Sequence, residues 1–449
     1  MSSVPIKILG SGLCGSLLSI ILAKRGYAVE VYEARQDPRK LSQAAGRSIN
    51  LAMSSRGINA LKYAGIFDQV KPLLIPMTGR MLHLKNGAKE LQPYGQKKDE
   101  VIYSVSRFNL NQILIETAEQ EYNVDIKFEH SVLSYDTENA KLQMRSPIKD
   151  FFLDAQGILV ADGAGSIIRK AFANKEPIMP TEEILPHSYK ELTIPANNDG
   201  SFQLEKNALH VWPRGQFMLI ALPNPTGDFT LTLFMPTTGK DSFAKLTTDV
   251  AVKEFFDRHF ASAVPLLPNL IHEFKNNPTG ILGTVRCQHW YHKNKLLLIG
   301  DAAHALVPFH AQGMNFAFDD CVELDKVIDQ HAPDWHKIFQ HFEANQSANA
   351  KAIQEMALDN YIEMRDGVLD PKFALRKELS FELEKRLPNQ FIPRYSMVMF
   401  HEQIPYAVSY QRGEVQKKLL EELTKNANKL EEIDLNAAER VVASRLVPL

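Results

Sequence analysis

The alternation of apolar and polar residues near the start of the chain predicts a strand, a turn, a helix and a second strand. Ile6–Leu9 is a short apolar run, and Ala28–Glu33 alternates as a half-buried strand does. The residues between them repeat with helical spacing, and Gly26 marks the end of that helix. The apolar positions of the helix are Leu13, Leu17, Leu18, Ile21 and Leu22.

The turn between the first strand and the helix contains the pattern G-x-G-x-x-G, at Gly10, Gly12 and Gly15. Glycine permits the tight turn, close approach of the backbone to a pyrophosphate, and close packing of helix on strand. The unpaired N–H groups and the dipole at the helix start favour phosphates. Glu33 ends the second strand, where a carboxylate can bind a ribose diol and would repel a 2′-phosphate. The segment therefore predicts a site for FAD or NAD rather than NADP.

A separate pair of strands interrupts this nucleotide-binding pattern. Thr78–Leu84 and Glu90–Tyr94 have strand-like sequences and are joined by an Asn-Gly turn. Arg80 and Tyr94 are therefore expected on neighbouring strands, where a guanidinium and a phenol could together bind a carboxylate. An arginine that simply faces solvent from a sheet surface is the alternative interpretation.

The remaining pattern predicts further helices and short strands. Helices are predicted over Ser104–Ala118, Thr248–Phe260, Glu414–Thr424 and Ala437–Arg445. Strands are predicted over Val124–Phe128, Val132–Tyr135, Phe202–Leu204, His210–Trp212, Phe217–Leu222 and Phe229–Phe234. Arg107 lies near the start of the first of these helices. Arg47 and Arg56 precede and begin another helical segment, where they could approach phosphate or be solvated.

Two further strand-to-helix turns carry polar residues. In GILVADGAGSIIR an apolar strand runs into Asp162 and Gly163, and in LLLIGDAAHALVPFHAQGMN a strand ends at Asp301 and a helix begins at Gly313. A strand-end carboxylate can accept hydrogen bonds from ribose or ribitol hydroxyls, and a helix N-terminus can stabilise an electron-rich ring. Either turn alone could be purely structural, whereas the three turns in this order are more specific.

Composition narrows the class of protein. With 449 residues, 45% hydrophobic and 23% charged, the chain is long enough for two or three globular domains. Its 51 Lys and Arg nearly balance its 53 Asp and Glu, so no basic surface argues for nucleic acid. Cys14, Cys287 and Cys321 form no metal-ligand spacing and indicate a reducing compartment without a disulfide framework. Because no apolar run reaches the roughly 18 residues of a membrane span, a cytoplasmic α/β enzyme is expected.

The order of these motifs resembles that of the single-component aromatic hydroxylases that use FAD. That family shows G-x-G-x-x-G, then D-G-x-x-S-x-x-R, then G-D-A-A-H-x-x-x-P. Five further segments narrow the resemblance to the kynurenine-hydroxylating members, over about residues 6–445. They are Gly46–Ala52 (GRSINLA), Gly79–His83 (GRMLH), Leu91–Gly95 (LQPYG), Ala357–Met364 (ALDNYIEM) and Phe391–Val398 (FIPRYSMV).

The resemblance implies an α/β fold in which a Rossmann-type FAD-binding domain is interleaved with a mixed β-sheet substrate domain. The expected bounds are 1–70, 101–180 and 284–350 for the FAD-binding domain, 71–100 and 181–283 for the substrate domain, and 351–449 for a C-terminal helical region. The apolar stripe of that last region is expected to pack on its own protein, with contact to a membrane as the alternative. Eukaryotic members carry a C-terminal membrane anchor, and none is expected here. A soluble bacterial form, with a homodimer as one possible assembly, is expected.

The resemblance also implies which residues bind FAD. They are Gly10, Gly12 and Gly15 at the pyrophosphate, Glu33 and Arg35 at the adenosine ribose, Ala52 and Arg107 on the flavin side, Asp162 and Gly163 in support, Asp301 at the ribityl chain, and Gly313, Met314 and Asn315 at the isoalloxazine ring. Arg107 is expected against phosphate or ribityl oxygens. Met314 and Asn315 are expected to use backbone groups.

For the substrate, L-kynurenine, the resemblance places Arg80 and Tyr94 on the carboxylate and completes the amino-acid site with Asn360 and Tyr395. The residues implied to pack the aromatic ring are Leu222, Phe234, Phe309 and Met364, each of which could instead be plain core. His310 is either an ordinary loop residue or a group near the substrate carbonyl. No other catalytic side chain and no metal is expected.

The implied reaction is 3-hydroxylation of L-kynurenine with NADPH and O2, in tryptophan degradation and the biosynthesis of NAD. NADPH would reduce FAD, reduced flavin would form a C4a-hydroperoxide, and its terminal oxygen would go to the ring carbon ortho to the amine. The protein would orient the substrate and exclude water. Two other functions remain open: a flavin hydroxylase of another aromatic acid, and a non-catalytic flavin-binding protein.

The chain departs from the family at two positions. Ala311 stands in PFHAQGMN where the family usually has Gly, which places a methyl group near the expected flavin, and Ala305 replaces a frequent Pro. Both departures are expected to be tolerated.

Overall fold

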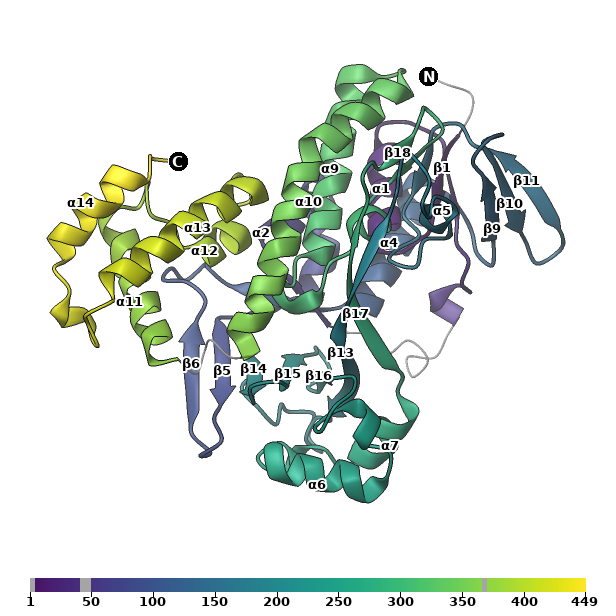
Figure 1. Ribbon diagram of the computed structural model, residues 1–449. Helices are drawn as coiled ribbons and strands as arrows, with labels where there is room; N and C mark the ends of the chain where they lie inside the picture. Colours follow the sequence, from purple (N-terminus) through teal and green to yellow (C-terminus); the bar gives the residue numbers. More distant parts are fainter. Residues whose placement is uncertain (1–4, 41–49, 366–369) are drawn as a thin grey trace. The chain divides into compact units, whose positions relative to one another are not determined.

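The computed structural model describes residues 5–40, 50–365 and 370–449. The chain forms two compact units, each assembled from three segments (Figure 1). The first unit consists of Met1–Leu74, Ser104–Leu185 and Ile281–Ala350, and the second of Ile75–Tyr103, Pro186–Gly280 and Lys351–Leu449.

The elements of the first unit alternate between strands and helices. They are β1 (Ile6–Leu9), α1 (Leu13–Lys24), β2 (Val29–Tyr32), β3 (Asn50–Met53), α2 (Ser55–Ala64), α3 (Phe67–Val70), α4 (Arg107–Tyr122), β8 (Asp125–Lys127), β9 (Ser131–Asp136), β10 (Lys141–Arg145), β11 (Asp150–Asp154), β12 (Ile158–Val160), α5 (Ile167–Ala171), β18 (Tyr291–His292), β19 (Leu296–Leu298), α8 (Asp301–His304), the 3₁₀ turn η6 (Pro308–His310) and α9 (Gly313–His331).

The second unit is built from a mixed sheet and helices. Its elements are β4 (Ile75–Met77), β5 (Gly79–His83), β6 (Lys89–Pro93), β14 (Ala208–Pro213), β15 (Met218–Pro223), β16 (Phe229–Pro236), α6 (Asp249–His259), α7 (Leu270–Asn276), α11 (Pro371–Arg386), α12 (Arg394–Phe400), α13 (Tyr406–Leu423) and α14 (Leu435–Arg445). The elements that continue from one unit into the other are β7 (Ile102–Ser106), β13 (Thr181–Ile194), β17 (Thr279–Arg286) and α10 (Trp335–Arg365).

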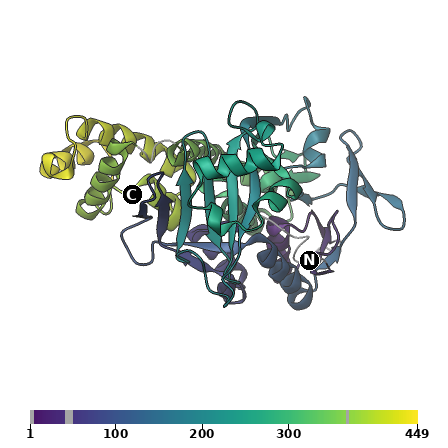
Figure 2. The ribbon, with the colours of Figure 1, turned by 90° about the horizontal axis from the view of Figure 1, so that it is seen from below.

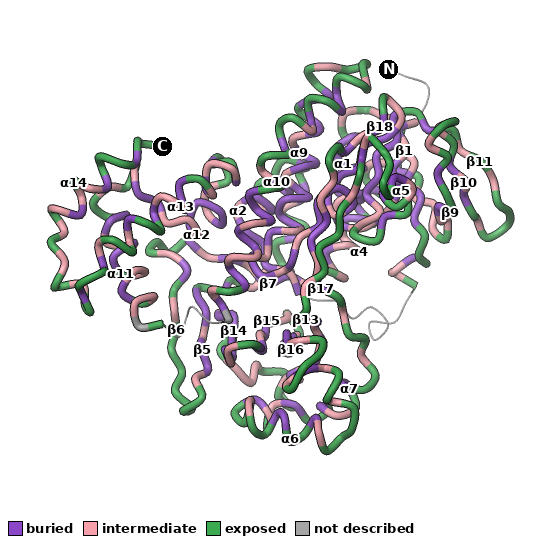
Figure 3. The backbone as a smooth tube through the Cα atoms, viewed as in Figure 1, coloured by how far each residue is buried: buried purple, intermediate pink, exposed green. Residues whose placement is uncertain are grey.

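The first unit is organised around a six-stranded sheet in the order β18-β19-β12-β1-β2-β8. β1 lies parallel to both β12 and β2, and α1 connects β1 to β2. α1 is apolar nearly all round and is mostly buried (Figure 3). Because β19, β12 and β1 are neighbouring parallel strands, the turns that carry Asp301, Asp162 and Gly10 all leave from one edge of the sheet. The predicted α/β class is therefore confirmed.

One predicted boundary in this unit is wrong. The helix predicted from Ser104 begins instead at Arg107, because β7 continues through Ser106. The Ser106 hydroxyl accepts a hydrogen bond from the Asn109 N–H at 3.3 Å, which caps the helix. A serine cap and the residues before it have no helical spacing of their own, so the apolar pattern alone cannot place this start.

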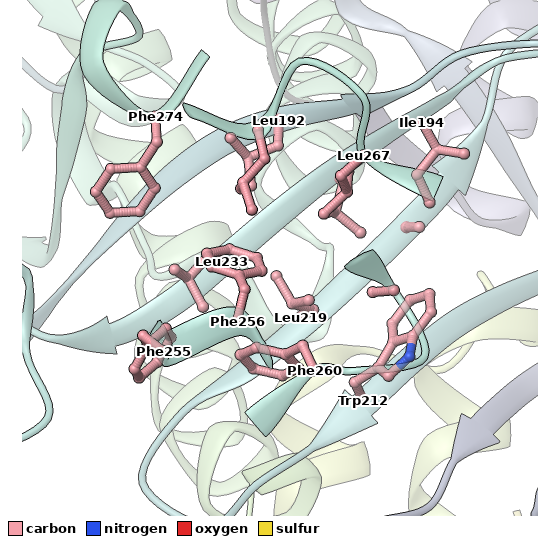
Figure 4. Close-up of a cluster of buried hydrophobic side chains, with 14 of the residues drawn as sticks. Leu192, Ile194, Trp212, Leu219, Leu233, Phe255, Phe256, Phe260, Leu267 and Phe274 are labelled. Carbon is pink, nitrogen blue, oxygen red and sulfur yellow. The ribbon is translucent and has the colours of Figure 1, made fainter. Parts of the chain in front are cut away.

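The second unit is built on a seven-stranded sheet in the order β17-β13-β16-β15-β14-β5-β6. α6 and α7 cover one face of this sheet, and in Figure 2 the teal helices lie across its strands. Alternate residues of β14, β15 and β16 point into the core between sheet and helices, with Trp212, Leu219 and Leu233 meeting Phe256 and Phe260 (Figure 4). The residues between them in sequence face the other side of the sheet.

A strand predicted over Phe202–Leu204 does not form. The segment is irregular, and both apolar side chains pack against the core under α6 and α7. The Phe202 ring meets the Phe229 ring edge-on, with centroids 5.6 Å apart. Three apolar-rich residues in a loop that covers a core have the same pattern as a short strand.

The C-terminal helices pack on one another. Their shared core is formed by Leu379, Leu383, Phe391, Leu419, Ala438, Val442 and Leu446. The apolar stripe of the tail is therefore covered by its own protein, as predicted. Within residues 5–40, 50–365 and 370–449, no helix combines the length and the apolar character that crossing a membrane requires.

Two buried histidines lie in the sheet of the second unit, on neighbouring strands. His83 Nε2 and His210 Nδ1 are 2.9 Å apart, and His210 Nε2 lies 2.8 Å from the carbonyl oxygen of Glu205. A carbonyl can only accept, so His210 donates to it through Nε2 and accepts from His83 through Nδ1. The His83 ring also stacks on Trp212 at 4.0 Å. Both rings are neutral in this chain of hydrogen bonds.

Acid is expected to destabilise the protein through this pair. Burial lowers the pKa of His83 to about 3 and of His210 to about 4, from 6.5. Between pH 6.5 and 4, therefore, these two histidines are protonated in the unfolded chain and remain neutral in the folded protein. The free energy of unfolding therefore falls as the pH falls through that range. Going from pH 7.5 to 5 should cost about 2–4 kcal/mol, measured by urea unfolding. In the His83→Gln/His210→Gln variant this pH dependence should largely disappear. An unchanged pH dependence would show that other groups cause it.

Candidate active site

The glycine turn after β1 leaves open space where a phosphate could approach. Gly10 has φ +98°, and a β-carbon there would lie 2.5 Å from the carbonyl oxygen of Ala161. A β-carbon on Gly15 would lie 1.9 Å from the carbonyl oxygen of Gly10. At Gly12, by contrast, no described residue other than its immediate neighbours in the chain would lie within 4 Å of a β-carbon. The first N–H groups of α1, from Leu13 on, have no partner within the helix and lie beside this space.

Glu33, at the end of β2, is buried and holds the glycine turn. Its Oε2 accepts hydrogen bonds from the Ser11 N–H (2.8 Å) and the Ser11 hydroxyl (3.2 Å), and its Oε1 accepts from Arg35 Nε (2.8 Å). Burial opposes its charge, but the Arg35 hydrogen bonds outweigh burial and lower the pKa of Glu33. A fixed carboxylate anion beside the turn is suited to a ribose diol. Arg35 itself is exposed.

The turns after β12 and β19 each present a carboxylate. Asp162 is half-buried; its Oδ1 makes no hydrogen bond within the described residues, and burial raises its pKa to about 6. Gly163 follows with φ +82° and no neighbour within 4 Å of a β-carbon among those residues. Asp301 begins α8, directly after Gly300.

Three residues without a predicted role fix these turns. The Asp320 Oδ2 accepts from the Gly300 N–H at 3.1 Å and lies 2.7 Å from His304 Nε2. The buried Arg169 donates to the carbonyl oxygen of Ala302 at 3.0 Å. Arg169 belongs to the serine–arginine spacing of the second motif and His304 to the third motif, whereas Asp320 had no sequence signal.

The start of α9 packs against β3 and α2 through Asn315. Its Nδ2 donates to the carbonyl oxygen of Ala52 (2.9 Å), and its Oδ1 accepts from the Ser54 N–H (2.9 Å). A β-carbon on Gly57 would lie 2.5 Å from the same Oδ1, so a side chain there would displace the Asn315 amide. The side chain is thus used within the protein, and the N-terminal backbone N–H groups of α9, which begins at Gly313, remain for a ligand.

Ala311, just before α9, has a left-handed backbone, with φ 55° and ψ 30°. This conformation costs an alanine about 1–2 kcal/mol and a glycine much less, which explains why glycine is usual there in the resembled family.

Replacing Ala311 by glycine is therefore expected to stabilise the protein. The relief of strain exceeds the added freedom of the unfolded chain, so the gain should be about 0.5–1 kcal/mol. Urea unfolding would measure it. The same change at Ala60, inside helix α2, should instead destabilise by about 1 kcal/mol or more. A loss of stability on changing Ala311 to glycine would contradict the strain.

The other predicted residues of the first unit differ in how far they are buried. Met314 is buried in the first turn of α9, and Phe309 and His310 are buried in η6. Arg107 is exposed at the start of α4, and Arg56 is buried in α2. Arg47, with most of the Gly46–Ala52 segment, lies outside the described residues.

In the second unit, Arg80, Leu222 and Phe234 share one face of the sheet. Leu222 follows Ala221, and Phe234 follows Leu233, each of which points into the core under α6 and α7. Leu222 and Phe234 therefore face the opposite side. On β14, His210 faces the core under α6 and α7, so its neighbour Leu209 faces the opposite side. Arg80 pairs in register with Leu209 and therefore lies on that opposite side as well. All three are buried.

Arg80 lies beside a stacked pair of tyrosines. Its guanidinium carbon is 5.8 Å from the Tyr94 ring centroid and 5.3 Å from the Tyr395 ring centroid, and the two rings stack at 5.4 Å. Within the described residues, Arg80 Nε and the Tyr94 hydroxyl are buried and make no hydrogen bond. We call Arg80, Tyr94 and Tyr395 the Arg80 clamp. Buried polar groups of this kind need a partner, and a ligand carboxylate would supply one.

The electrostatics of the clamp favour an anion. Burial raises the pKa of Tyr94 to about 12 and that of Tyr395 well above its ordinary value, so both phenols are protonated donors at neutral pH. Burial, and then the charge of Arg80, lower the pKa of Lys377 to about 8. Glu363 Oε1 lies 3.6 Å from an Arg80 nitrogen, a long ion pair. Sequence reasoning assigned no role to Lys377 or Glu363, although Glu363 lies within the ALDNYIEM segment that carries the resemblance.

α10 brings the remaining predicted residues to the same part of the second unit. Asn360 and Met364 are buried and one turn apart, and Asn360 Nδ2 lies 3.5 Å from the Met364 sulfur. Glu363 lies between them in sequence and reaches Arg80. Among the described residues, no three His, Cys, Asp or Glu side chains are grouped so as to hold a metal ion.

Comparisons with known sequences connect this geometry to a family. Residues 3–336 match the family described as FAD binding domain. The chain is 44% identical to kynurenine 3-monooxygenase of Stenotrophomonas maltophilia (strain K279a) over 447 residues, covering 99% of this chain and 98% of that protein. It is 43% identical to kynurenine 3-monooxygenase of Myxococcus xanthus (strain DK1622) over 445 residues, covering 99% and 96%.

Solved structures with the same fold are more distant in sequence. The tetrameric form of 2-methyl-3-hydroxypyridine-5-carboxylic acid oxygenase superimposes with a TM-score of 0.65 at 18% identity, covering 85% of this chain and 98% of that one. PqsL of P. aeruginosa in complex with 2-aminobenzoylacetate gives a TM-score of 0.63 at 16% identity, covering 81% and 97%. These likenesses support the fold.

Proposed function

The chain belongs to the family of kynurenine 3-monooxygenases, and from this premise we propose that the second unit binds the amino-acid end of L-kynurenine through the Arg80 clamp. The protein is an FAD-dependent monooxygenase that acts on kynurenine. The finer assignment of roles to individual residues is the proposal.

The observation that carries this assignment is the burial of the Arg80 guanidinium beside two protonated phenols. A carboxylate can accept hydrogen bonds from the guanidinium and from both phenol hydroxyls, whereas a ligand with only a neutral aromatic ring could not. Leu222 and Phe234 lie on the same sheet face and offer apolar contact to a ring. Glu363, already near Arg80, can pair with the ammonium group that accompanies the carboxylate in an α-amino acid.

The residues of the first unit suit FAD, and different residues would bind different parts of the cofactor. The open space at Gly12 and the start of α1 suit the pyrophosphate, and Glu33 suits the adenosine ribose. Asp301 would hold the ribityl chain, with the unsatisfied Asp162 oxygen beside the adjacent strand end. The backbone N–H groups at the start of α9 would meet the electron-rich part of the ring system.

FAD, when bound, accepts a hydride from NADPH and activates O2 for transfer to the aromatic ring. The ring carbon ortho to the amine of kynurenine is already electron-rich, so the protein need not supply a strong base. Its residues fix the substrate carboxylate, fill the space around the ring and exclude water. His310 is proposed only as a group near the substrate carbonyl.

The test is an anaerobic stopped-flow trace of flavin absorbance after mixing the purified protein with NADPH, with and without L-kynurenine. Strong acceleration of reduction by kynurenine, followed by formation of 3-hydroxykynurenine in air, would support the proposal. Acceleration by a hydroxybenzoate but not by kynurenine would favour a hydroxylase of another aromatic acid. Bound flavin whose reduction responds to neither would favour a non-catalytic flavin protein.

Cellular location and assembly are further parts of the proposal. The three free thiols support a cytoplasmic location. A homodimer is proposed as the assembly, and light scattering of the purified protein at two concentrations would test it. A monomer mass at both concentrations would reject it.

A further inference from the structure

Two cysteines that are far apart in sequence meet inside the first unit. Cys14 in α1 and Cys321 in α9 have sulfur atoms 3.8 Å apart, although 307 positions separate them. Both thiols also lie within hydrogen-bond reach of the carbonyl oxygen of Ala317, at 3.7 Å for Cys14 and 3.2 Å for Cys321. The two side chains therefore point at one another from facing helices.

The two thiols differ in how accessible they are. Cys14 is partly exposed, whereas Cys321 is fully buried. A small oxidant can thus reach Cys14 first, with Cys321 directly behind it. Burial raises the pKa of Cys321 well above its ordinary value and that of Cys287 to about 12, so neither is a strong nucleophile by itself. Cys321 differs because its sulfur lies 3.8 Å from that of Cys14, where it can attack once Cys14 is oxidised.

Cys14 also lies where the proposed FAD site is built. It is the second residue of α1, in the turn whose N–H groups follow Gly12. Its sulfur packs against the backbone before Asp301, since a β-carbon on Gly300 would lie 3.1 Å from it. A displacement of the Cys14 sulfur would therefore shift the backbone of both the pyrophosphate turn and the Asp301 turn.

We propose that Cys14 and Cys321 form a reversible disulfide on oxidation by hydrogen peroxide, and that this disulfide weakens the binding of FAD. A disulfide requires sulfur atoms about 2.05 Å apart, so the pair must close from 3.8 Å. Closure draws the first turn of α1 toward α9 and moves the N–H groups that would bind the pyrophosphate.

The chemistry proceeds in two balanced steps. The Cys14 thiol releases its proton, and the thiolate attacks one peroxide oxygen so that the O–O bond breaks and a sulfenic acid and hydroxide form. The hydroxide takes up the released proton and becomes water. The Cys321 sulfur then attacks the Cys14 sulfur, the S–O bond breaks, and the departing oxygen leaves as water with the Cys321 proton. In total, two thiols are oxidised, one peroxide is reduced, and two waters form. A dithiol reductant reverses the change by thiol–disulfide exchange.

The test uses the FAD-loaded protein after removal of reductant. The protein is treated with hydrogen peroxide, its remaining thiols are alkylated, and its peptides are analysed by mass spectrometry without reduction. We expect a peptide linking Cys14 to Cys321, with Cys287 still alkylated, and loss of the link on treatment with dithiothreitol. FAD release on dilution, followed by flavin fluorescence, should show at least fivefold weaker binding after oxidation.

Variants separate the pair from other oxidation. Cys287→Ser should respond to peroxide as the wild type does. Cys14→Ser and Cys321→Ser should each give no link and no peroxide-dependent release of FAD, and either one suffices if the other folds poorly. Oxidation that leaves Cys14 and Cys321 unlinked would overturn the proposal, as would a linked protein with unchanged FAD affinity. Neither readout involves kynurenine, so the outcome is separate from that of the substrate proposal.

Discussion

Replacing Arg80 by alanine is expected to raise the KM for L-kynurenine by about 30- to 700-fold while FAD stays bound. The guanidinium is buried, and its Nε has no hydrogen-bond partner within the described residues. Removing one side of a buried, hydrogen-bonded charge pair costs about 2–4 kcal/mol, and each 1.4 kcal/mol corresponds to a factor of about ten. Titration of the oxidised protein with kynurenine would measure the loss directly as a weaker Kd.

Graded variants make this prediction specific. Arg80→Lys keeps the charge but loses the planar fork, so its affinity should fall between those of the wild type and Arg80→Ala. Tyr94→Phe and Tyr395→Phe each remove one neutral donor and should cost about 0.5–1.5 kcal/mol. Arg258→Ala, at an exposed position on α6 of the same unit, is the matched control and should leave binding unchanged. Equal kynurenine affinity in Arg80→Ala and the control would reject the clamp.

The hairpin that carries Arg80 could be predicted because its signals are local. The strands β5 and β6 pair antiparallel around an Asn-Gly turn, and Arg80 lies opposite Gln92, two residues before Tyr94. The glycine turn after β1 was readable for the same reason, since turn, strand and helix signals all fall within one short stretch. Neighbouring residues suffice to specify both features.

The rest of the site depends on contacts that no local pattern encodes. Tyr395 stacks on Tyr94 from a helix about 300 residues later in the chain, and only the family resemblance pointed to it. Glu363 reaches Arg80 from α10 and was not predicted at all. Cys14 and Cys321 looked unrelated in sequence because their meeting depends on how α1 and α9 pack. Side chains that converge through tertiary packing leave no periodic signal.

Alanine substitutions at two glycines after β1 should distinguish a loss of folding stability from a loss of FAD binding. At Gly15 a β-carbon would overlap the Gly10 carbonyl oxygen at 1.9 Å, so Gly15→Ala forces the backbone apart. Overpacking of this kind costs about 1–3 kcal/mol or more, and FAD binding should be lost together with stability. At Gly12 no described residue other than its immediate neighbours in the chain comes within 4 Å of a β-carbon, so Gly12→Ala should leave the stability of the apoprotein unchanged.

Gly12→Ala should nevertheless weaken FAD binding by about 100-fold, or about 3 kcal/mol, because the added methyl stands where the pyrophosphate must approach the backbone. Urea unfolding of both apoproteins and flavin titration of both variants would measure the two quantities independently. Normal FAD affinity in Gly12→Ala would mean that the open space beside this residue does not receive the pyrophosphate, and the cofactor would then have to enter this unit by another route. A stable Gly15→Ala apoprotein would show instead that the turn can relax around the clash.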